Sequence, residues 1–109
     1  MSEPRRQRPR VACNVSFRGG GAATNIAGRI TDLSGTGLFI ATRTFLPVGE
    51  EVHLEFELPT GKVEAVGEVR WVARGPEVAE PGLGIRFLRL SAASARAIDD
   101  AVEGRRPGL

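Results

Sequence analysis

The sequence is poor in the residues on which most catalytic and metal sites depend. It holds one cysteine, Cys13, and one histidine, His53, among 109 residues. A single cysteine excludes an internal disulfide and a cysteine-based zinc site. His53 has no candidate nucleophile beside it, and the chain offers no convergent acid and base pair and no set of metal ligands. We therefore expect a protein that is not an enzyme and that carries neither a metal nor a cofactor.

Long apolar runs are missing as well. No apolar stretch approaches the ~20 residues of a membrane-spanning helix, and the charged N-terminus is not followed by the apolar segment of a secretory signal. We expect a cytoplasmic protein that does not insert into membranes. Aromatic residues are few and the net charge is only +2, so a nucleic acid polymer is not the expected partner. A small barrel that binds nucleic acid through a basic N-terminus is the weaker alternative.

What the chain does contain is a repeated alternation of apolar and polar residues. Such alternation over short segments is typical of half-buried β-strands. Turns rich in glycine and proline separate the segments. The predicted strands are Val11–Phe17, Thr24–Leu33, Leu38–Thr42, Val52–Leu58, Val63–Ala73 and Gly82–Leu88.

The last part of the chain has the period of a helix. Ser91 is a suitable N-cap, Ile98 and Val102 lie one turn apart, and Gly104 provides a stop. This pattern predicts a helix over residues 92–103. Six short strands and one helix favour a mainly β fold, a six-stranded antiparallel barrel with a C-terminal helix packed on it, because closing a small sheet removes its exposed edges.

The alternation also predicts which way single side chains face. Asp32 falls on the same face as Ile30, and Trp71 on the same face as Val69, so packing in the core or at its rim is favoured for Trp71 over contact with a ligand. By the same reasoning Cys13 is predicted to be buried. His53 is expected to face solvent, as are two strand arginines at positions 70 and 86.

Arginine is concentrated at the N-terminus. Arg5, Arg6, Arg8 and Arg10 stand against a single acid, Glu3. A local cluster of guanidinium groups attracts phosphates, because the planar fork of donors matches phosphate oxygens. We interpret residues 1–9 as a flexible basic arm, residues 10–104 as one folded domain and residues 105–109 as a tail.

A second motif follows about twenty residues later. Residues 32–37 read DLSGTG, which is D-x-S-x-x-G, and Arg6 and Arg10 form R-x-x-x-R before it. The two motifs in this order resemble the ligand signature of PilZ domains, which are bacterial receptors for cyclic di-GMP. The resemblance covers the chain from Arg5 to the C-terminal helix. It implies the same barrel and helix that the alternation favours.

The resemblance also implies roles for individual residues. Arg6 and Arg10 match the arginines that bind phosphate and stack on or bond guanine. Asp32 would accept from the guanine N1 and N2 donors, Ser34 would donate its hydroxyl to phosphate or guanine, and Gly37 would permit the turn and a close backbone approach.

Two further residues extend this ligand site. Arg5 precedes the first motif and is similar to a residue that joins the arginine cluster in some family members, which favours two stacked ligand molecules over one. Trp71 offers a ring that can stack on guanine, as the alternative to its packing role. Because the arm must be ordered on binding, we expect a dissociation constant in the micromolar range.

The function that follows is that of a receptor and adaptor. Cyclic di-GMP would order the arginine arm against the barrel and create a surface for a protein effector that the sequence does not identify. Such adaptors resemble regulators of motility, surface polysaccharide or development, and we expect a monomer or weak dimer. The alternative is a PilZ-like interaction module that binds a protein partner and no nucleotide.

Overall fold

The strand with the cleanest alternation shows how the sheet is built. The computed structural model describes residues 11–17 and 25–104, and in it strand β4 (Glu51–Leu58) exposes each odd-numbered side chain and buries each even-numbered one. Because one face is buried and the other charged, a slip of one residue would put glutamates into the core, so the register is fixed. His53 is exposed on β4, as predicted.

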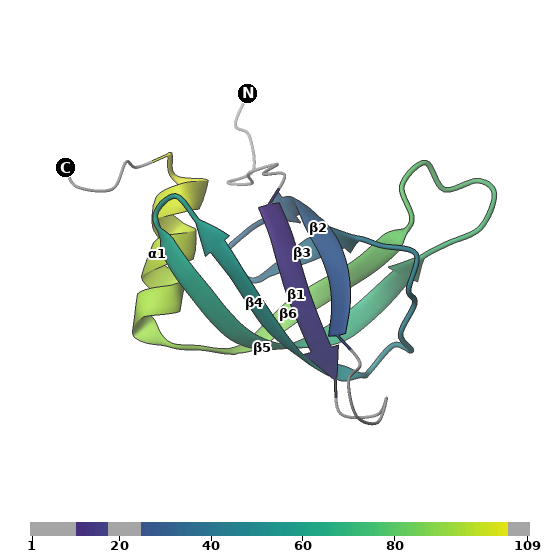
Figure 1. The fold of residues 1–109 in the computed structure, drawn as a ribbon, viewed down its shortest axis with the longest axis horizontal. Helices are drawn as coiled ribbons and strands as arrows, with labels where there is room; N and C mark the ends of the chain where they lie inside the picture. Colours follow the sequence, from purple (N-terminus) through teal and green to yellow (C-terminus); the bar gives the residue numbers. More distant parts are fainter. Residues whose placement is uncertain (1–10, 18–24, 105–109) are drawn as a thin grey trace.

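Six antiparallel strands close into a barrel (Figure 1). The strand order is β1-β2-β3-β6-β5-β4, and β4 pairs back onto β1. This closure confirms the predicted six-stranded antiparallel barrel. The other strands are β1 (Val11–Phe17), β2 (Asn25–Leu33), β3 (Gly37–Ala41), β5 (Gly61–Ala73) and β6 (Gly82–Leu90).

Aliphatic side chains from all six strands fill the interior. The largest fully buried ones include Val15, Ile30, Ile40, Val52, Val69 and Leu83. Cys13 lies among them with 2% of its surface exposed, as predicted. Burial raises the pKa of the Cys13 thiol to about 12, and a hydrogen bond with the backbone of Glu55 opposes part of this rise.

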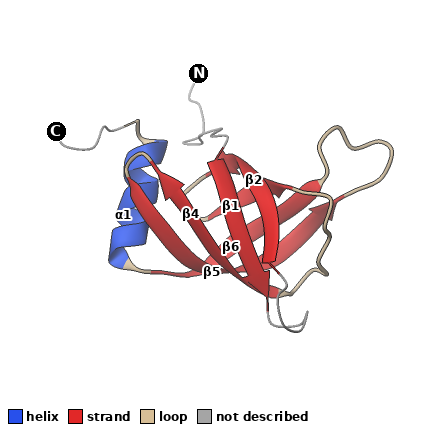
Figure 2. Ribbon diagram, viewed as in Figure 1, coloured by secondary structure: helices blue, strands red, loops and turns tan. Residues whose placement is uncertain are grey.

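Helix α1 (Ala92–Val102) packs mainly on β5 (Figure 2). Its N-cap is Ser91, whose Oγ accepts from the backbone N–H of Ser94 at 3.0 Å. The hydroxyl of Ser94 is itself buried and accepts from the backbone N–H of Glu64 in β5 at 3.0 Å. Thr60, in the turn before β5, donates to the carbonyl of Ala97 at 2.6 Å. These bonds and the burial of Ala97 attach the helix to the barrel.

The predicted element bounds differ from the observed ones by one or two residues. The helix ends at Val102 and not at 103, and β6 continues to Leu90 because a shift in its register with β5 lets pairing resume beyond Leu88. Within the part of the chain that the structure describes, no helix is long and apolar enough to cross a membrane. The proposed limits of the arm and tail fall outside the described residues and stay a prediction.

Candidate functional site

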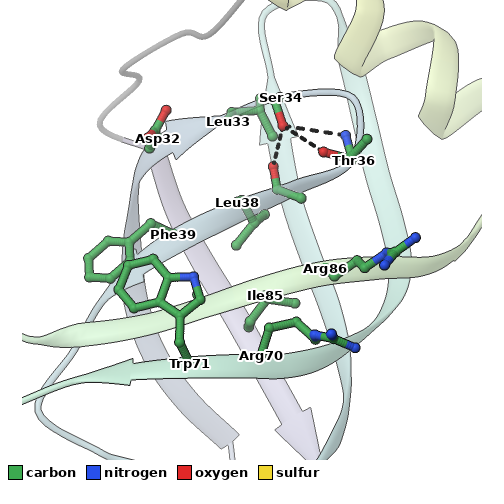
Figure 3. Close-up of a pocket in the computed structure, with 12 residues that line it drawn as sticks. Asp32, Leu33, Ser34, Thr36, Leu38, Phe39, Arg70, Trp71, Ile85 and Arg86 are labelled. Atoms are coloured by element: carbon green, nitrogen blue, oxygen red, sulfur yellow. Dashed lines mark hydrogen bonds between the residues drawn. The ribbon is translucent and has the colours of Figure 1, made fainter. Parts of the chain in front are cut away.

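The turn between β2 and β3 carries the second motif. The backbone N–H of Ser34 donates to the carbonyl of Gly37 at 2.9 Å, and the Ser34 hydroxyl donates to the same oxygen at 3.4 Å. Ser34 Oγ also accepts from the N–H of Thr36 at 3.4 Å and lies 3.2 Å from its Oγ1 (Figure 3). The carbonyl of Thr36 accepts from the N–H of Phe87 at 2.9 Å. The turn is therefore closed on itself and attached to β6.

Gly37 is required here for a reason that the sequence does not reveal. A Cβ built on Gly37 would overlap the carbonyl oxygen of Ile85 in β6. The backbone of Gly37 does not have positive φ. The residue therefore permits the close approach of β3 to β6, and the turn itself does not depend on a left-handed glycine at this position.

Asp32 lies on the outer face of the barrel. Ile30 pairs with Ile40 and Asp32 pairs with Phe39, so Thr31 is an extra residue in β2. A bulge of this kind reverses the alternation that follows it. The prediction that Asp32 shares the face of Ile30 is therefore wrong, and the carboxylate is presented outside the core.

A second bulge turns Trp71 outward in the same way. The register of β5 with β6 shifts between Val69 and Trp71, which makes Arg70 the extra residue. Val69 is fully buried, whereas 52% of Trp71 is exposed and Val72 packs against the core. The predicted core or rim position of Trp71 is therefore wrong. The same shift turns Val72 inward, although an alternation counted from Val69 would place it on the outer face.

Trp71 is held by an aromatic neighbour and by a glycine. Its indole stacks on the ring of Phe39, with ring centroids 5.1 Å apart and planes inclined by 25°. The Cδ1–Nε1–Cε2 side of the indole takes the space that a Cβ at Gly84 would need. The Phe39 ring in turn lies over Gly82, where a Cβ would be 2.6 Å from Phe39 Cζ. Two glycines of β6 thus make room for two aromatic rings.

These residues border one pocket on the outside of the barrel. Its volume is about 430 Å³, and it brings together the predicted site residues Asp32, Ser34, Gly37 and Trp71 (Figure 3). Arg5, Arg6 and Arg10, which complete the predicted site, lie outside the described residues. The remaining lining residues are Leu33, Thr36, Leu38, Phe39, Arg70, Gly84, Ile85 and Arg86.

Two of the lining residues are arginines that the alternation predicts to face solvent and not a ligand. Arg70 and Arg86 are both exposed, as predicted, and both also line the pocket. Arg70 Nη1 lies 3.1 Å from Glu68 Oε1, and Glu68 stands opposite Arg86 in the β5–β6 ladder. An exposed pair of this kind contributes little to stability, so Arg70 can exchange Glu68 for another anion at little cost in free energy.

Phe39 is an aromatic pocket residue that the sequence analysis does not predict. Leu38, Phe39 and Ile40 are all apolar, so their alternation does not tell which side chains face inward, and the structure buries Leu38 and Ile40 and turns Phe39 outward. A large aromatic ring at an outward strand position needs a neighbour to cover it. The pocket thus offers a carboxylate, hydroxyl groups, guanidinium groups and an aromatic pair. That combination suits a ligand with planar rings and anionic groups.

Comparison with known families and proteins gives a sequence match over most of the chain. The model of the family described as PilZ domain matches residues 4–104, which includes both motifs, all six strands and the helix. No curated protein matches the chain in sequence.

Solved structures match the fold at low sequence identity. The Bacillus subtilis inhibitor of motility MotI/DgrA superposes with a TM-score of 0.75 at 15% identity, covering 91% of this chain and 48% of that one, so the chain spans about half of its length. The PilZ domain of Escherichia coli YcgR with c-di-GMP gives 0.66 at 18%, covering 88% and 81%. The PilZ domain of CeSA from a cellulose-synthesizing bacterium gives 0.64 at 14%, covering 91% and 95%.

Proposed function

The chain belongs to the PilZ domain family, and from this we propose that it is a receptor for cyclic di-GMP that acts as an adaptor to a protein effector. The observation that carries the proposal is the convergence of Asp32, Ser34 and Trp71 on one pocket outside the barrel. These three side chains come from β2, from the turn after it and from β5. The bulge in β2 turns Asp32 to the outer face of the barrel, and the bulge in β5 turns Trp71 to the same face.

The chemistry of the pocket matches the parts of the ligand. A carboxylate at Asp32 accepts two parallel hydrogen bonds from the N1 and N2 donors of guanine. The indole of Trp71 offers a ring for base stacking, which is worth about 1–3 kcal/mol per base. Arg70 and Arg86 stand where anionic groups of the ligand can meet them, in addition to the hydroxyl of Ser34.

The arginine arm is proposed to supply the remaining contacts to phosphate. Arg10 directly precedes Val11, and Val11 pairs with Ile30, two residues before Asp32. The chain therefore enters the barrel beside the strand that carries the motif. At about 3.3–3.6 Å per residue, the segment from Arg5 to Arg10 can extend over about 17 Å, and with Arg5 included the site would favour two stacked ligand molecules.

The output of the receptor is proposed to be a new surface made of the arm, the ligand and the outer face of the barrel. Ordering the arm on binding would couple occupancy of the pocket to recognition by a protein effector. We propose that the protein works in the cytoplasm as a monomer or weak dimer, in the control of motility, surface polysaccharide or development. No step in this proposal requires catalysis or a cofactor.

The test is a calorimetric titration of the purified protein with cyclic di-GMP. We expect saturable binding with a micromolar dissociation constant. Arg10→Ala and Asp32→Ala should each weaken it by at least tenfold, because each removes charge-assisted bonds worth about 1.5–3 kcal/mol. Arg96→Ala is the matched control, since Arg96 is an exposed arginine on α1 away from the pocket.

Two outcomes would count against the proposal. Tight binding by both variants would refute this assignment of the site. Absence of heat and of thermal stabilisation at high ligand concentration would refute the receptor function and would favour a PilZ module that recognises a protein partner without nucleotide.

A further inference from the structure

Four residues from four strands form a single row across the outer face of the barrel. Asp32 of β2 pairs with Phe39 of β3, Phe39 pairs with Gly84 of β6, and Gly84 pairs with Trp71 of β5. We refer to these four residues as the cross-strand row. At the usual strand spacing the backbone of the row spans about 14 Å. Its two ends are the residues to which guanine contacts are assigned above.

The two central residues of the row, Phe39 and Gly84, determine where the indole of Trp71 lies. Gly84 has no side chain, and the indole of Trp71 leans into the vacant space until it meets the ring of Phe39. Figure 3 shows the two rings side by side, with the indole between Phe39 and the part of the pocket bordered by Arg70. Phe39 therefore stands between the Asp32 backbone and the indole, and its ring limits how far the indole can move in that direction.

We propose that Phe39 is a positioning residue that holds Trp71 in the orientation in which it receives the ligand. More than half of Trp71 is exposed, and a tryptophan with so little cover would otherwise sample several rotamers. Binding would then have to select one of them, which lowers the apparent affinity by the fraction of time spent in the others. The offset stack on Phe39 holds Trp71 in one rotamer already in the free protein, so binding does not have to select it. The role in ligand affinity rests on the proposed function, whereas the restraint on Trp71 does not.

The restraint can be measured without any ligand. Trp71 is the only tryptophan in the chain, so its fluorescence reports on this position alone. In Phe39→Leu we expect faster decay of fluorescence anisotropy and about twofold stronger quenching by acrylamide, while Phe39→Tyr, which keeps the ring, should behave like the parent protein. Phe45→Leu is the matched control, because Phe45 is a half-buried phenylalanine that contacts Arg74. Unchanged quenching in Phe39→Leu would overturn the proposal.

The role in affinity is tested by a double-mutant cycle with cyclic di-GMP. Phe39→Leu should weaken binding by about 3- to 10-fold in the parent protein and should cause no further loss in Trp71→Ala, because a positioning residue acts only through the residue that it positions. An equal loss in both backgrounds would overturn the proposal, since Phe39 would then contact the ligand itself. If the parent protein binds no cyclic di-GMP, the proposed function fails, and the fluorescence comparison still decides whether Phe39 restrains Trp71.

Discussion

Cys13 is a buried thiol whose protonation affects stability at high pH. Its pKa of about 12 in the folded protein lies well above the value of about 8.5 in an unfolded chain. Between these two values the unfolded state has lost the proton and the folded state keeps it. The free energy of unfolding therefore falls as pH rises above about 9.

The prediction is measured by denaturant unfolding at pH 8 and at pH 10.5. We expect the decline over this interval to be smaller by about 2 kcal/mol in Cys13→Ala than in the parent protein. Part of the decline is shared by both proteins because other groups titrate in this range. Equal declines would show that the thiol is not shielded from solvent in the folded state.

Single residues of the site were predictable where the resemblance to a known motif identified them. Asp32, Ser34 and Gly37 follow from the likeness of D-x-S-x-x-G to the PilZ ligand signature, which does not depend on which way a strand faces. Counting the alternation from Val69 predicts Trp71 in the core or at its rim, because the extra residue at 70 cannot be seen in a count of alternating residues. The ligand roles of all four residues stay predictions until binding is measured.

At the scale of elements, helix α1 depends on one buried hydroxyl. Ser94 is 3% exposed, and its Oγ is the acceptor for the backbone N–H of Glu64 in β5. Ser94→Ala would remove the acceptor from this part-buried N–H, which costs about 1 kcal/mol. We expect the thermal midpoint to fall by roughly 4–8 °C for each kcal/mol.

The matched control for Ser94 is Ala93→Ser, the exposed neighbouring position in the first turn of the same helix. It exchanges the same two residue types where neither is buried, and we expect a change within about 0.5 kcal/mol. The comparison is made by thermal melting followed by circular dichroism. A Ser94→Ala protein as stable as the parent would show that the helix does not rely on this bond.

The faces of a strand follow from the sequence where one face is exposed to solvent along its whole length. They do not follow where a bulge interrupts the strand. β4 alternates from end to end, so both of its faces, and its bounds to within one residue, follow from the sequence. β2 and β5 alternate only in parts, because Thr31 and Arg70 each add a residue that has no partner. The helix was recognisable from its cap, its period and Gly104, which has φ of 76°.

At the scale of the whole molecule, the barrel closes without the first ten residues. All six strands and α1 lie within residues 11–17 and 25–102, and β1 completes the circle by pairing with both β2 and β4. We expect a protein that lacks residues 1–10 to melt cooperatively within a few degrees of the parent, because every strand pairing described within residues 11–17 and 25–104 is kept. Binding of cyclic di-GMP should be lost, since the proposed phosphate contacts are removed with the arm.

The measurement is a thermal melt of the shortened protein, followed by the same calorimetric titration. A deletion that extends through Phe17 is the contrasting variant, because it removes β1 and opens the barrel at two ladders, and we expect it not to fold. Full ligand affinity in the protein without residues 1–10 would exclude the arm from the site. The pocket arginines 70 and 86 would then be sufficient.

The two bulges reconcile two spacings that a regular strand cannot combine. Ile30 and Leu33 are both buried although three positions separate them, and Val69 and Val72, at the same separation, both pack in or against the core, so each strand needs one extra residue, Thr31 or Arg70, between them. Deleting Thr31 would make Asp32 the direct neighbour of Ile30, and deleting Arg70 would make Trp71 the direct neighbour of Val69, so both side chains would stay on the outer face in a regular ladder. In a barrel of this design, a single codon can therefore be lost at either bulge without turning the ligand residues into the core.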